Sequence, residues 1–299
     1  MMNAMNFATD GRDWPNRNAS RFIEAAGFQW HVQVFGQGPP LLLLHGTGAS
    51  THSWRQIAPY LADRFTLVIP DLPGHGFTSK PPAHAYTLPG MAMAVGQLMS
   101  SLGIAPNIVS GHSAGAAVAI RMSLDKILTP QVIVSVNGAL LPFQGLAGHI
   151  FSPLAKLMCL NPFIPRLFAW RALDRMAVDR LLAGTGSITT PEDIELYGRL
   201  FSSPSHCAAA LGMMARWDLD TLARDLPQLI TPLCLIAAAR DRAIPPSDAE
   251  RVRALVKGSQ VATLPDAGHL AHEEKPAAVA DIIIASAIKN GITLPDARL

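Results

Sequence analysis

The segment Gly111-His112-Ser113-Ala114-Gly115 constrains the fold more than any other stretch of this chain. A short extended run, 107–110, leads into it, and an alanine-rich run, 116–122, follows it. This context predicts a strand, a tight turn at Ser113 and a helix, the arrangement of a nucleophile elbow. Because the flanking glycines lack a Cβ, strand and helix can approach closely while the serine adopts a strained backbone. Such a turn would present the Ser113 hydroxyl at the edge of a sheet.

Two later residues can supply the acid and the base that a serine nucleophile needs. Asp241 follows the apolar run 233–238, and His269 follows the run 260–264, so each comes just after a predicted strand. Taken singly, Asp241 could cap a turn and His269 could be an ordinary surface histidine. Their order along the chain, serine then aspartate then histidine, is the one expected for an elbow of this kind. The three residues together predict a catalytic triad.

Backbone N–H groups that could stabilise a developing oxyanion come from two places. Ala114 directly follows the candidate nucleophile, and Thr47 lies in the loop 45–48 after the apolar run 41–44. A glycine-containing loop after a strand could instead bind a phosphate, but neither G-x-x-x-x-G-K-[ST] nor G-x-G-x-x-G occurs in the chain. We therefore expect Thr47 and Ala114 to form an oxyanion hole, with His45 supporting the loop.

The motifs at 45–48, 71–76 and 111–115, followed by Asp241 and by Gly268-His269, occur in the order seen in α/β-hydrolases. The chain resembles this family over nearly its whole length. The resemblance implies a mostly parallel central sheet flanked by helices, with a Ser113–His269–Asp241 triad. One departure is Ala238, because many members have glycine three residues before the acid. Asp71 precedes the serine, and we expect it to brace its own loop.

A narrower resemblance concerns the N-terminal and middle segments of the chain. It is carried by 10–17, 19–22, 30–34, 137–143, 145–148 and 151–156. These segments are similar to the magnesium-chelatase accessory branch of the family, which serves bacteriochlorophyll biosynthesis and photosynthesis. The resemblance implies a role near magnesium insertion and transient contact with magnesium chelatase. It leaves two functions open: a serine hydrolase, esterase-like on a hydrophobic substrate, or a non-catalytic tetrapyrrole-binding accessory protein that retains a triad.

Composition excludes several other classes of protein. With 299 residues, 49% of them hydrophobic and 15% charged, the chain can bury a large core and is not disordered. A net charge of +2 is far from the basic excess of a nucleic-acid binder, so we expect no nucleic-acid partner. The ten histidines form no H-E-x-x-H pattern, and we expect neither a metal nor an organic cofactor.

The cysteines and the N-terminal segment indicate the cellular compartment that we expect for the protein. Cys159, Cys207 and Cys234 are odd in number and widely spaced, which favours a reducing compartment over a disulfide framework. The first 17 residues contain no apolar core of a secretory signal. We expect a cytoplasmic protein.

Apolar strands and helices alternate along most of the chain, which predicts a parallel sheet covered on both faces. Residues 140–222 interrupt this alternation with helical, proline-punctuated sequence. We expect a helical lid at 140–222, inserted between core segments 1–139 and 223–299. The predicted strands are 21–34 as a hairpin, 41–44, 65–69, 107–109, 132–136, 233–237 and 260–264; the predicted helices are 54–61, 88–102, 114–126, 246–256 and 276–290.

The stretch 127–155 has no charged residue and is long enough to span a membrane. Pro130, Pro142 and Pro153 would break a single helix there, so we expect a buried strand at 132–136 and then loop. Aromatic and basic residues mix in the lid that follows, an arrangement that can give peripheral contact with a membrane surface. The alternative is a lid that buries its apolar side on the core, and the two are compatible.

Several other residues are candidates for the substrate pocket. His112, Met213, Met214 and Trp217 could line it, although any apolar core could contain such side chains. His149 and His206 could bind the magnesium of a porphyrin.

Overall fold

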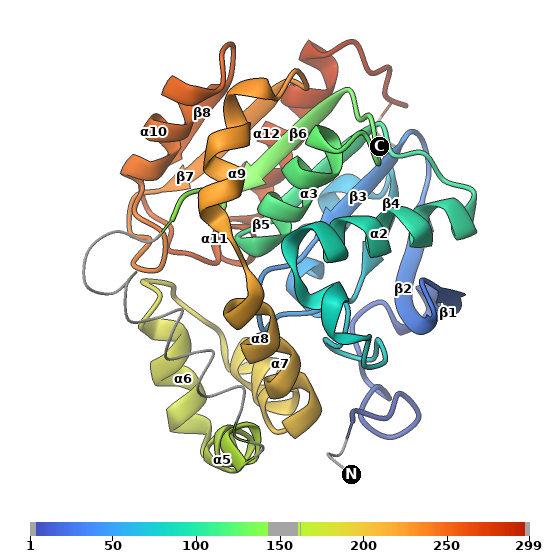
Figure 1. Cartoon of the computed structure of the whole chain (residues 1–299), viewed down its shortest axis with the longest axis vertical. Coiled ribbons are helices and arrows are strands. Elements are labelled where there is room, and N and C mark those ends of the chain that lie inside the picture. Colours follow the sequence, from blue (N-terminus) through green and yellow to red (C-terminus); the bar gives the residue numbers. More distant parts are fainter. Residues whose placement is uncertain (1–3, 143–160, 162, 297–299) are drawn as a thin grey trace.

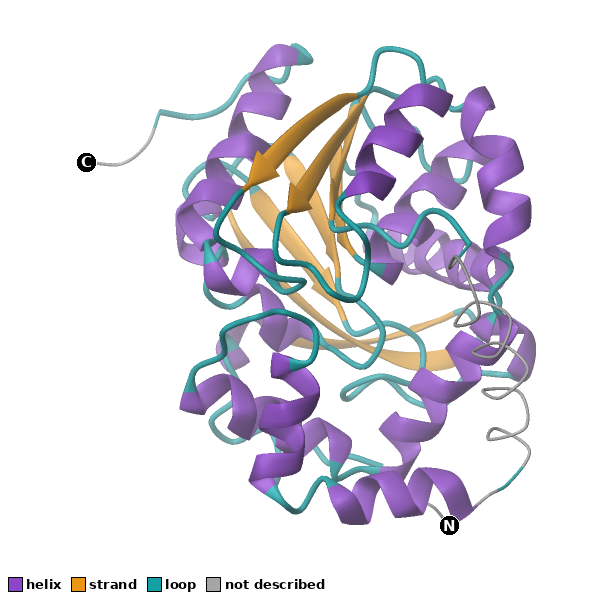
Figure 2. Ribbon diagram, turned by 90° about the vertical axis from the view of Figure 1, so that its left-hand side faces the viewer, coloured by secondary structure: helices purple, strands orange, loops and turns teal. Residues whose placement is uncertain are grey.

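One twisted sheet, covered by helices on both faces, forms the centre of the molecule (Figures 1 and 2). The computed structural model describes residues 4–142, 161 and 163–296. Its strands are β1 (Ser20–Ala25), β2 (Phe28–Gly36), β3 (Pro40–Leu44), β4 (Thr66–Pro70), β5 (Ile108–His112), β6 (Val132–Val136), β7 (Leu233–Ala238) and β8 (Gln260–Leu264).

The strand order is β1-β2-β4-β3-β5-β6-β7-β8. β1 pairs antiparallel with β2, and β2 with β4, while all the later neighbours are parallel. The predicted N-terminal hairpin and the mostly parallel sheet are therefore confirmed. The carboxyl ends of β3, β5, β6, β7 and β8 meet at one edge, which is where open sheets of this kind place their ligands.

Helices cover both faces of the sheet, and a further group of helices lies at one end of the molecule (Figure 1). They are α1 (Ala58–Leu61), α2 (Leu88–Leu102), α3 (Ala114–Leu124), α5 (Phe163–Arg171), α6 (Arg175–Ala183), α7 (Pro191–Phe201), α8 (Pro204–Arg216), α9 (Leu219–Asp225), α10 (Ser247–Leu255), α11 (Ala271–Glu274) and α12 (Pro276–Lys289). None of the helices in the described part of the chain is long and apolar enough to cross a membrane.

The apolar run of β3 shows why the core has two layers. Leu42 and Leu44 pack with α2 and α3, whereas Leu41 and Leu43 pack with α1 and α12 on the opposite face. Alternate side chains of a strand point to opposite faces, so a strand buried on both sides is apolar throughout.

The predicted helix 54–61 is wrong in its first half. Residues Thr51–Trp54 form a 3-10 helix, and the α-helix begins only at Ala58. Pro59 lies in the first turn of α1, where its missing N–H breaks no helical hydrogen bond. Helix α7 begins with a capping box formed by Thr190 and Asp193.

Helices α5 to α8 fall inside the segment predicted as the lid, and they lie together at the lower end of Figure 1. We call α5 to α8, with the loops that join them, the cap. The predicted end of the lid at residue 222 lies within α9, whose Leu222 packs into the core layer of α2 and α3. The division into core and lid remains a prediction.

The N-terminal segment is attached to both the sheet and the cap. Trp14 is 2% exposed and packs in an apolar cluster with side chains from α6 and α7. Its indole N–H donates to Thr51 Oγ1 at 3.0 Å. Arg199 of α7 donates to Asp13 at 2.6 Å and to the Asp10 carbonyl at 2.8 Å. The N-terminal segment therefore ties the cap to the core.

We expect Trp14→Ala to lower the free energy of unfolding by about 3–5 kcal/mol, because it removes a large buried side chain and leaves a cavity. Trp170→Ala is the matched control: this side chain is 67% exposed, so its loss should change the free energy by less than about 0.5 kcal/mol. Chemical denaturation followed by fluorescence and circular dichroism measures both. Equal effects of the two variants would contradict the structural role of Trp14.

Candidate active site

The predicted strand, turn and helix around Ser113 are confirmed as β5, a sharp turn and α3. Ser113 has φ 51° and ψ −114°, a conformation that costs a residue with a side chain about 1–3 kcal/mol. A Cβ on Gly111 would lie 2.4 Å from the Ala116 nitrogen, and a Cβ on Gly115 would lie 2.2 Å from the Leu44 carbonyl oxygen. Both glycines are therefore required by the close packing of α3 on β3 and β5.

Asp241 and His269 meet at the carboxyl edge of the sheet. His269 Nδ1 donates to Asp241 Oδ2 at 2.8 Å, and both side chains are buried. The other carboxylate oxygen of Asp241 accepts from the N–H groups of Ala243 (2.8 Å) and Ile244 (2.9 Å). With its proton on Nδ1, His269 keeps the Nε2 lone pair to act as a base.

Asn137 joins three segments at this edge, and sequence reasoning missed it. Its Nδ2 donates to the carbonyls of Gly268 (3.0 Å) and His269 (2.9 Å). Its Oδ1 accepts from the Ala238 N–H at 2.8 Å. The available signal was the pair Asn137-Gly138 after a strand, because asparagine tolerates a positive φ, here 46°. Ala238 itself ends β7 in extended backbone, so this position needs no glycine.

His112 lies behind the candidate base. It is 2% exposed, its Nε2 donates to the His269 carbonyl at 2.9 Å, and its ring lies 4.7 Å from the His269 ring. Burial holds the pKa of His112 well below its usual range, so the ring is neutral. A side chain placed in this way supports the His269 loop, whereas the sequence suggested that it lines the pocket.

The loop between α6 and α7 contacts both catalytic loops. Ser187 Oγ accepts from the Leu270 N–H at 2.9 Å, and the Thr185 carbonyl accepts from the Arg242 N–H at 3.0 Å. A Cβ on Gly186 would lie 1.9 Å from the Arg240 carbonyl oxygen. The cap is thus in direct contact with the segments that carry Asp241 and His269.

The loop after β3 lies against Ser113. A Cβ on Gly46 would lie 3.1 Å from Ser113 Cβ, so the loop backbone approaches the nucleophile closely. Ala114 begins α3, and its N–H therefore has no acceptor within the helix. Among the described residues, none accepts a hydrogen bond from the Thr47 N–H. Both N–H groups assigned to an oxyanion hole are thus available for one.

Two buried side chains brace this loop and the next, as predicted. His45 Nδ1 donates to the Gly46 carbonyl at 2.8 Å, and its Nε2 accepts from the Leu72 N–H at 2.8 Å. Burial lowers the pKa of His45 to about 4. Asp71 accepts from the N–H groups of Thr51 (2.7 Å) and Phe77 (2.9 Å). Burial raises its pKa, but the neighbouring His31, the His45 ring and the hydrogen bond from the Phe77 N–H outweigh burial and lower the pKa of Asp71 to about 2.

His206 is not available to bind a magnesium porphyrin. It is buried, its Nδ1 accepts from the Gly76 N–H at 3.0 Å, and its Nε2 donates to the Gly48 carbonyl at 2.9 Å. Both ring nitrogens are therefore occupied. The other candidate, His149, lies outside the described residues.

The remaining pocket candidates lie at different depths. Met213 is fully buried, and its sulfur accepts from Thr47 Oγ1 at 3.6 Å, so it lies beside the oxyanion loop. Met214 and Trp217 are partly buried, and Trp217 packs against the core layer of α2 and α3. The Trp217 Nε1 is buried with no hydrogen-bond partner among the described residues.

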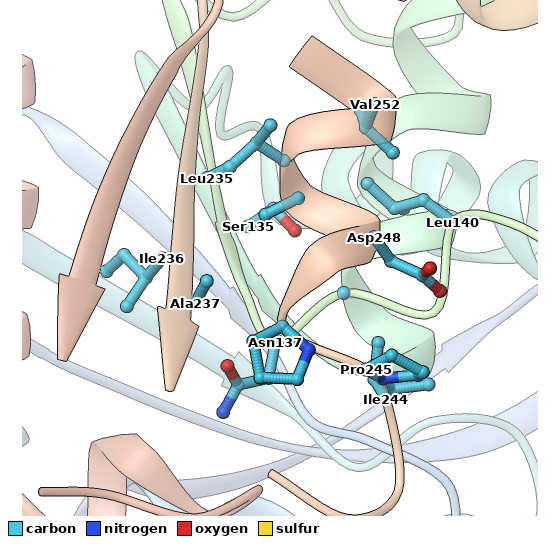
Figure 3. A pocket seen from close by; sticks show the side chains of 13 residues that line it. Ser135, Asn137, Leu140, Leu235, Ile236, Ala237, Ile244, Pro245, Asp248 and Val252 are labelled. Carbon is cyan, nitrogen blue, oxygen red and sulfur yellow. The ribbon is translucent and has the colours of Figure 1, made fainter. Parts of the chain in front are cut away.

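A small cavity lies beside the Asp241 loop (Figure 3). Its walls include Ser135 and Asn137 from the β6 end, Pro245 from the loop before α10, and Asp248 and Val252 from α10 itself. Its volume of about 20 Å³ fits about one water molecule, and none of the three triad residues lines it. This cavity is therefore not the substrate site.

Metal binding finds no support in the described residues, since no group of three or more His, Cys, Asp or Glu side chains there could hold an ion. Cys207 and Cys234 are buried and free.

A buried charged cluster connects α7 to the segment after His269. Arg55 pairs with Asp193 of α7, and its guanidinium lies 3.6 Å from Glu273 of α11. Tyr197 of α7 donates to Glu273 at 2.8 Å. Burial, together with the nearby Asp193 carboxylate, raises the pKa of Glu273 to about 8, despite the opposing effects of Tyr197 and Arg55.

We expect the free energy of unfolding to fall by about 2 kcal/mol as the pH rises from 6 to about 8. In this range the folded protein keeps a proton on Glu273, whereas the unfolded chain has already lost it. Stability is therefore greatest at the lower pH and declines toward the folded pKa. Urea denaturation at a series of pH values measures the slope. Glu273→Gln, which keeps an acceptor for Tyr197, should remove this decline; an unchanged slope in that variant would contradict the assignment.

Comparison with known proteins identifies the family of this chain. Residues 41–282 match the family model described as the alpha/beta hydrolase family. The chain is 37% identical over 266 residues to a protein of Rhodobacter capsulatus named magnesium-chelatase 30 kDa subunit, which covers 87% of this chain and 92% of that protein.

Two more distant relatives show the range of the similarity. A soluble epoxide hydrolase of Corynebacterium sp. (strain C12) is 28% identical over 271 residues, covering 85% of this chain and 92% of that protein. The solved structure of a thermophilic esterase from Thermogutta terrifontis is 26% identical, with a TM-score of 0.71, and the match covers 92% of this chain and 99% of that one. The family model and the Rhodobacter relative both match most of the chain, which therefore belongs to the α/β-hydrolase family.

Proposed function

We propose that this chain is a serine hydrolase that cleaves an ester-like bond in a hydrophobic substrate. The observation that carries the proposal is the hydrogen-bonded pair of His269 and Asp241, at the same sheet edge as the strained turn of Ser113. A serine hydroxyl needs such a pair to lose its proton as it attacks. The N–H groups of Thr47 and Ala114 support the proposal, because they are free to stabilise an oxyanion.

The proposed reaction has two halves. His269 Nε2 takes the Ser113 proton while the serine oxygen attacks the carbonyl carbon, and the N–H groups of Thr47 and Ala114 stabilise the oxyanion. As the oxyanion collapses, the carbon–oxygen bond to the leaving alcohol breaks, and His269 gives that alcohol its proton. Water, deprotonated by His269, then attacks the acyl-serine carbonyl. The bond between this carbon and the Ser113 oxygen breaks, His269 returns the proton to Ser113, and the acid is released. Asp241 stabilises the charged imidazolium in both halves.

The identity of the nucleophile favours acyl transfer over epoxide opening. If the Ser113 oxygen opened an epoxide, the product would be an ether, which water and a histidine base do not hydrolyse. An acyl-serine is an ester, and the same base and oxyanion hole can cleave it. A serine nucleophile therefore does not fit the epoxide chemistry named for the Corynebacterium relative.

The Rhodobacter relative supports a setting for this activity. Its name associates that protein with magnesium chelatase. We propose that the present chain acts near the magnesium-insertion step of bacteriochlorophyll synthesis, on a hydrophobic molecule. A tetrapyrrole is one candidate for this molecule. The proposal includes transient contact with magnesium chelatase, a cytoplasmic location and peripheral membrane contact through the cap.

A second function is favoured by the same relative. The chain would bind or escort a tetrapyrrole for the chelatase, with its triad retained and not needed. The two proposals differ in whether the pathway requires the Ser113 hydroxyl.

We expect a fluorophosphonate probe to label the wild-type protein covalently at Ser113, because the activated serine attacks the phosphorus as it would a carbonyl. Ser113→Ala should not be labelled, whereas Ser135→Ala, which removes another buried hydroxyl near this sheet edge, should be labelled at the wild-type rate. Mass spectrometry of the labelled peptide reports the site. A wild-type protein that the probe does not label would contradict the hydrolase proposal.

The same Ser113→Ala variant separates the two functions in the cell. In a strain that lacks this gene, a catalytic role predicts no recovery of pigment. Full recovery would favour the tetrapyrrole-binding function, provided that the variant accumulates to the wild-type level.

We expect Asn137→Ala to slow the labelling of Ser113 by about 10- to 100-fold, because it frees the His269 loop from β6 and β7 and displaces the base. Glycine tolerates the same positive φ, so labelling of Asn137→Gly should be slowed by a similar factor if the lost hydrogen bonds are responsible and not backbone strain. Asn290→Ala, remote from the site, is the control. Labelling of both Asn137 variants at the wild-type rate would show that His269 does not depend on this junction.

A further inference from the structure

Helix α5 is oriented with its large side chains away from the protein. Its buried residues are Pro165 and Ala169. Phe163 is 68% exposed, and Leu167, Phe168 and Trp170 are exposed as well. A surface helix of a soluble protein normally buries its large apolar side chains and exposes its small or polar ones. In α5 this pattern is reversed.

The exposed apolar surface continues beyond α5. Of the 14 large hydrophobic side chains that are exposed among the described residues, eight lie in the stretch 163–188. An apolar surface of this density marks an interaction site more often than a chance exposure. We define the cap face as the seven of these that belong to α5, α6 and the turn between them: Phe163, Leu167, Phe168, Trp170, Leu173, Met176 and Leu181.

Positive charge is interspersed with these apolar side chains. Helix α5 contains Arg166 and Arg171 and no acidic residue. Over 163–183 the arginines number four against two aspartates, which leaves a net charge of +2. The Arg166 guanidinium lies 5.9 Å from the centre of the Phe163 ring, so the cationic and aromatic groups share one surface. One aspartate, Asp174, is paired with Arg171 at 2.6 Å.

The combination of apolar and positively charged side chains favours one kind of partner for the cap face. Aromatic rings and the aliphatic stems of arginines suit the boundary between lipid headgroups and acyl chains, and the guanidinium groups suit anionic headgroups. A second copy of the chain would instead bring two positively charged surfaces together. Figure 1 shows α5 and α6 at the end of the molecule farthest from the sheet, where a flat surface could reach them.

We propose that the cap face docks on the surface of an anionic phospholipid bilayer, with α5 lying in the plane of the interface. The docking deepens the membrane contact of the proposed function by naming the surface and the lipid class, and in that respect it rests on that function. A hydrophobic substrate dissolved in the bilayer would then be concentrated beside the cap. The contact itself does not require the triad.

The test is co-sedimentation of the full-length protein with large vesicles. We expect binding to vesicles of phosphatidylglycerol and phosphatidylcholine in equal parts, much weaker binding to phosphatidylcholine alone, and loss of binding at high salt. The double variant Phe163→Ser, Trp170→Ser should lower the apparent partition coefficient at least ~10-fold, since two large apolar side chains no longer enter the interface. Arg166→Glu should weaken binding to the anionic vesicles alone.

The matched control is Met93→Ser, Ile288→Ser, which removes two large exposed apolar side chains from α2 and α12. It should bind as the wild type does. Failure of the wild type to bind anionic vesicles would overturn the proposal, as would equal losses in the control and the cap-face variant. A concentration-dependent dimer that the cap-face variant abolishes would assign this surface to a second copy of the chain.

The readout separates docking from catalysis. Sedimentation does not depend on Ser113. A wild-type protein that binds vesicles but is not labelled by the probe would support the docking proposal and contradict the hydrolase proposal. A wild-type protein that is labelled but does not bind vesicles would support the hydrolase proposal and contradict the docking proposal.

Discussion

The close approach of α3 to the carboxyl ends of β3 and β5 is the constraint on which the rest of the site depends. Gly111 and Gly115 permit it, since a Cβ at either position would overlap backbone atoms of α3 or β3. The approach places Ser113 in its strained turn at the start of α3, with the loop after β3 close beside it. The proposed nucleophile, the proposed oxyanion hole and their rigid support would therefore all depend on one packing contact. The two core layers, each continuous on its own face of the sheet, hold that contact in place.

The second organising feature is the set of polar contacts that hold the His269 loop. Asn137 and His112 hold its carbonyls from behind, and Ser187 holds the following N–H from the cap. Through Arg55, Asp193, Tyr197 and Glu273, the cap is also bonded to α11, which follows the loop directly. The position of His269 therefore depends on the docking of the cap as well as on the sheet. A membrane that contacts α5 would meet the same structural unit whose α6–α7 loop contacts the catalytic segments.

The parts of the site that could be predicted from the sequence are those with a local signal. Ser113, Asp241 and His269 each follow an apolar run, and parallel strands bring their carboxyl ends together. Thr47 and Asp71 are found for the same reason. Asn137 and Ser187 act on partners 131 and 83 residues away in the chain, so no local pattern marks them. The sequence marks His112, because this residue lies in the elbow motif, but not its contact. Its partner, the His269 carbonyl, is 157 residues away in the chain. The helix predicted at 54–61 is wrong in its first half, because Pro59 favours the first turn of a helix and α1 begins only at Ala58.

The electrostatics of the buried histidines indicate which one can act as the base. Burial lowers the pKa of His45, His112, His206 and His272, so these rings remain neutral at pH 7. A neutral ring held in this way orients backbone groups, as His45 and His206 do, but it resists the positive charge that a general base acquires. His269 differs from these four because it donates to a carboxylate, that of Asp241, whose charge would stabilise the imidazolium formed in the proposed deprotonation of Ser113. The carboxylate in turn accepts two backbone N–H groups, so its negative charge costs little to maintain in a buried place. In the proposed reaction, the position of Asp241 would therefore direct the Ser113 proton to His269 and not to the four buried rings that remain neutral.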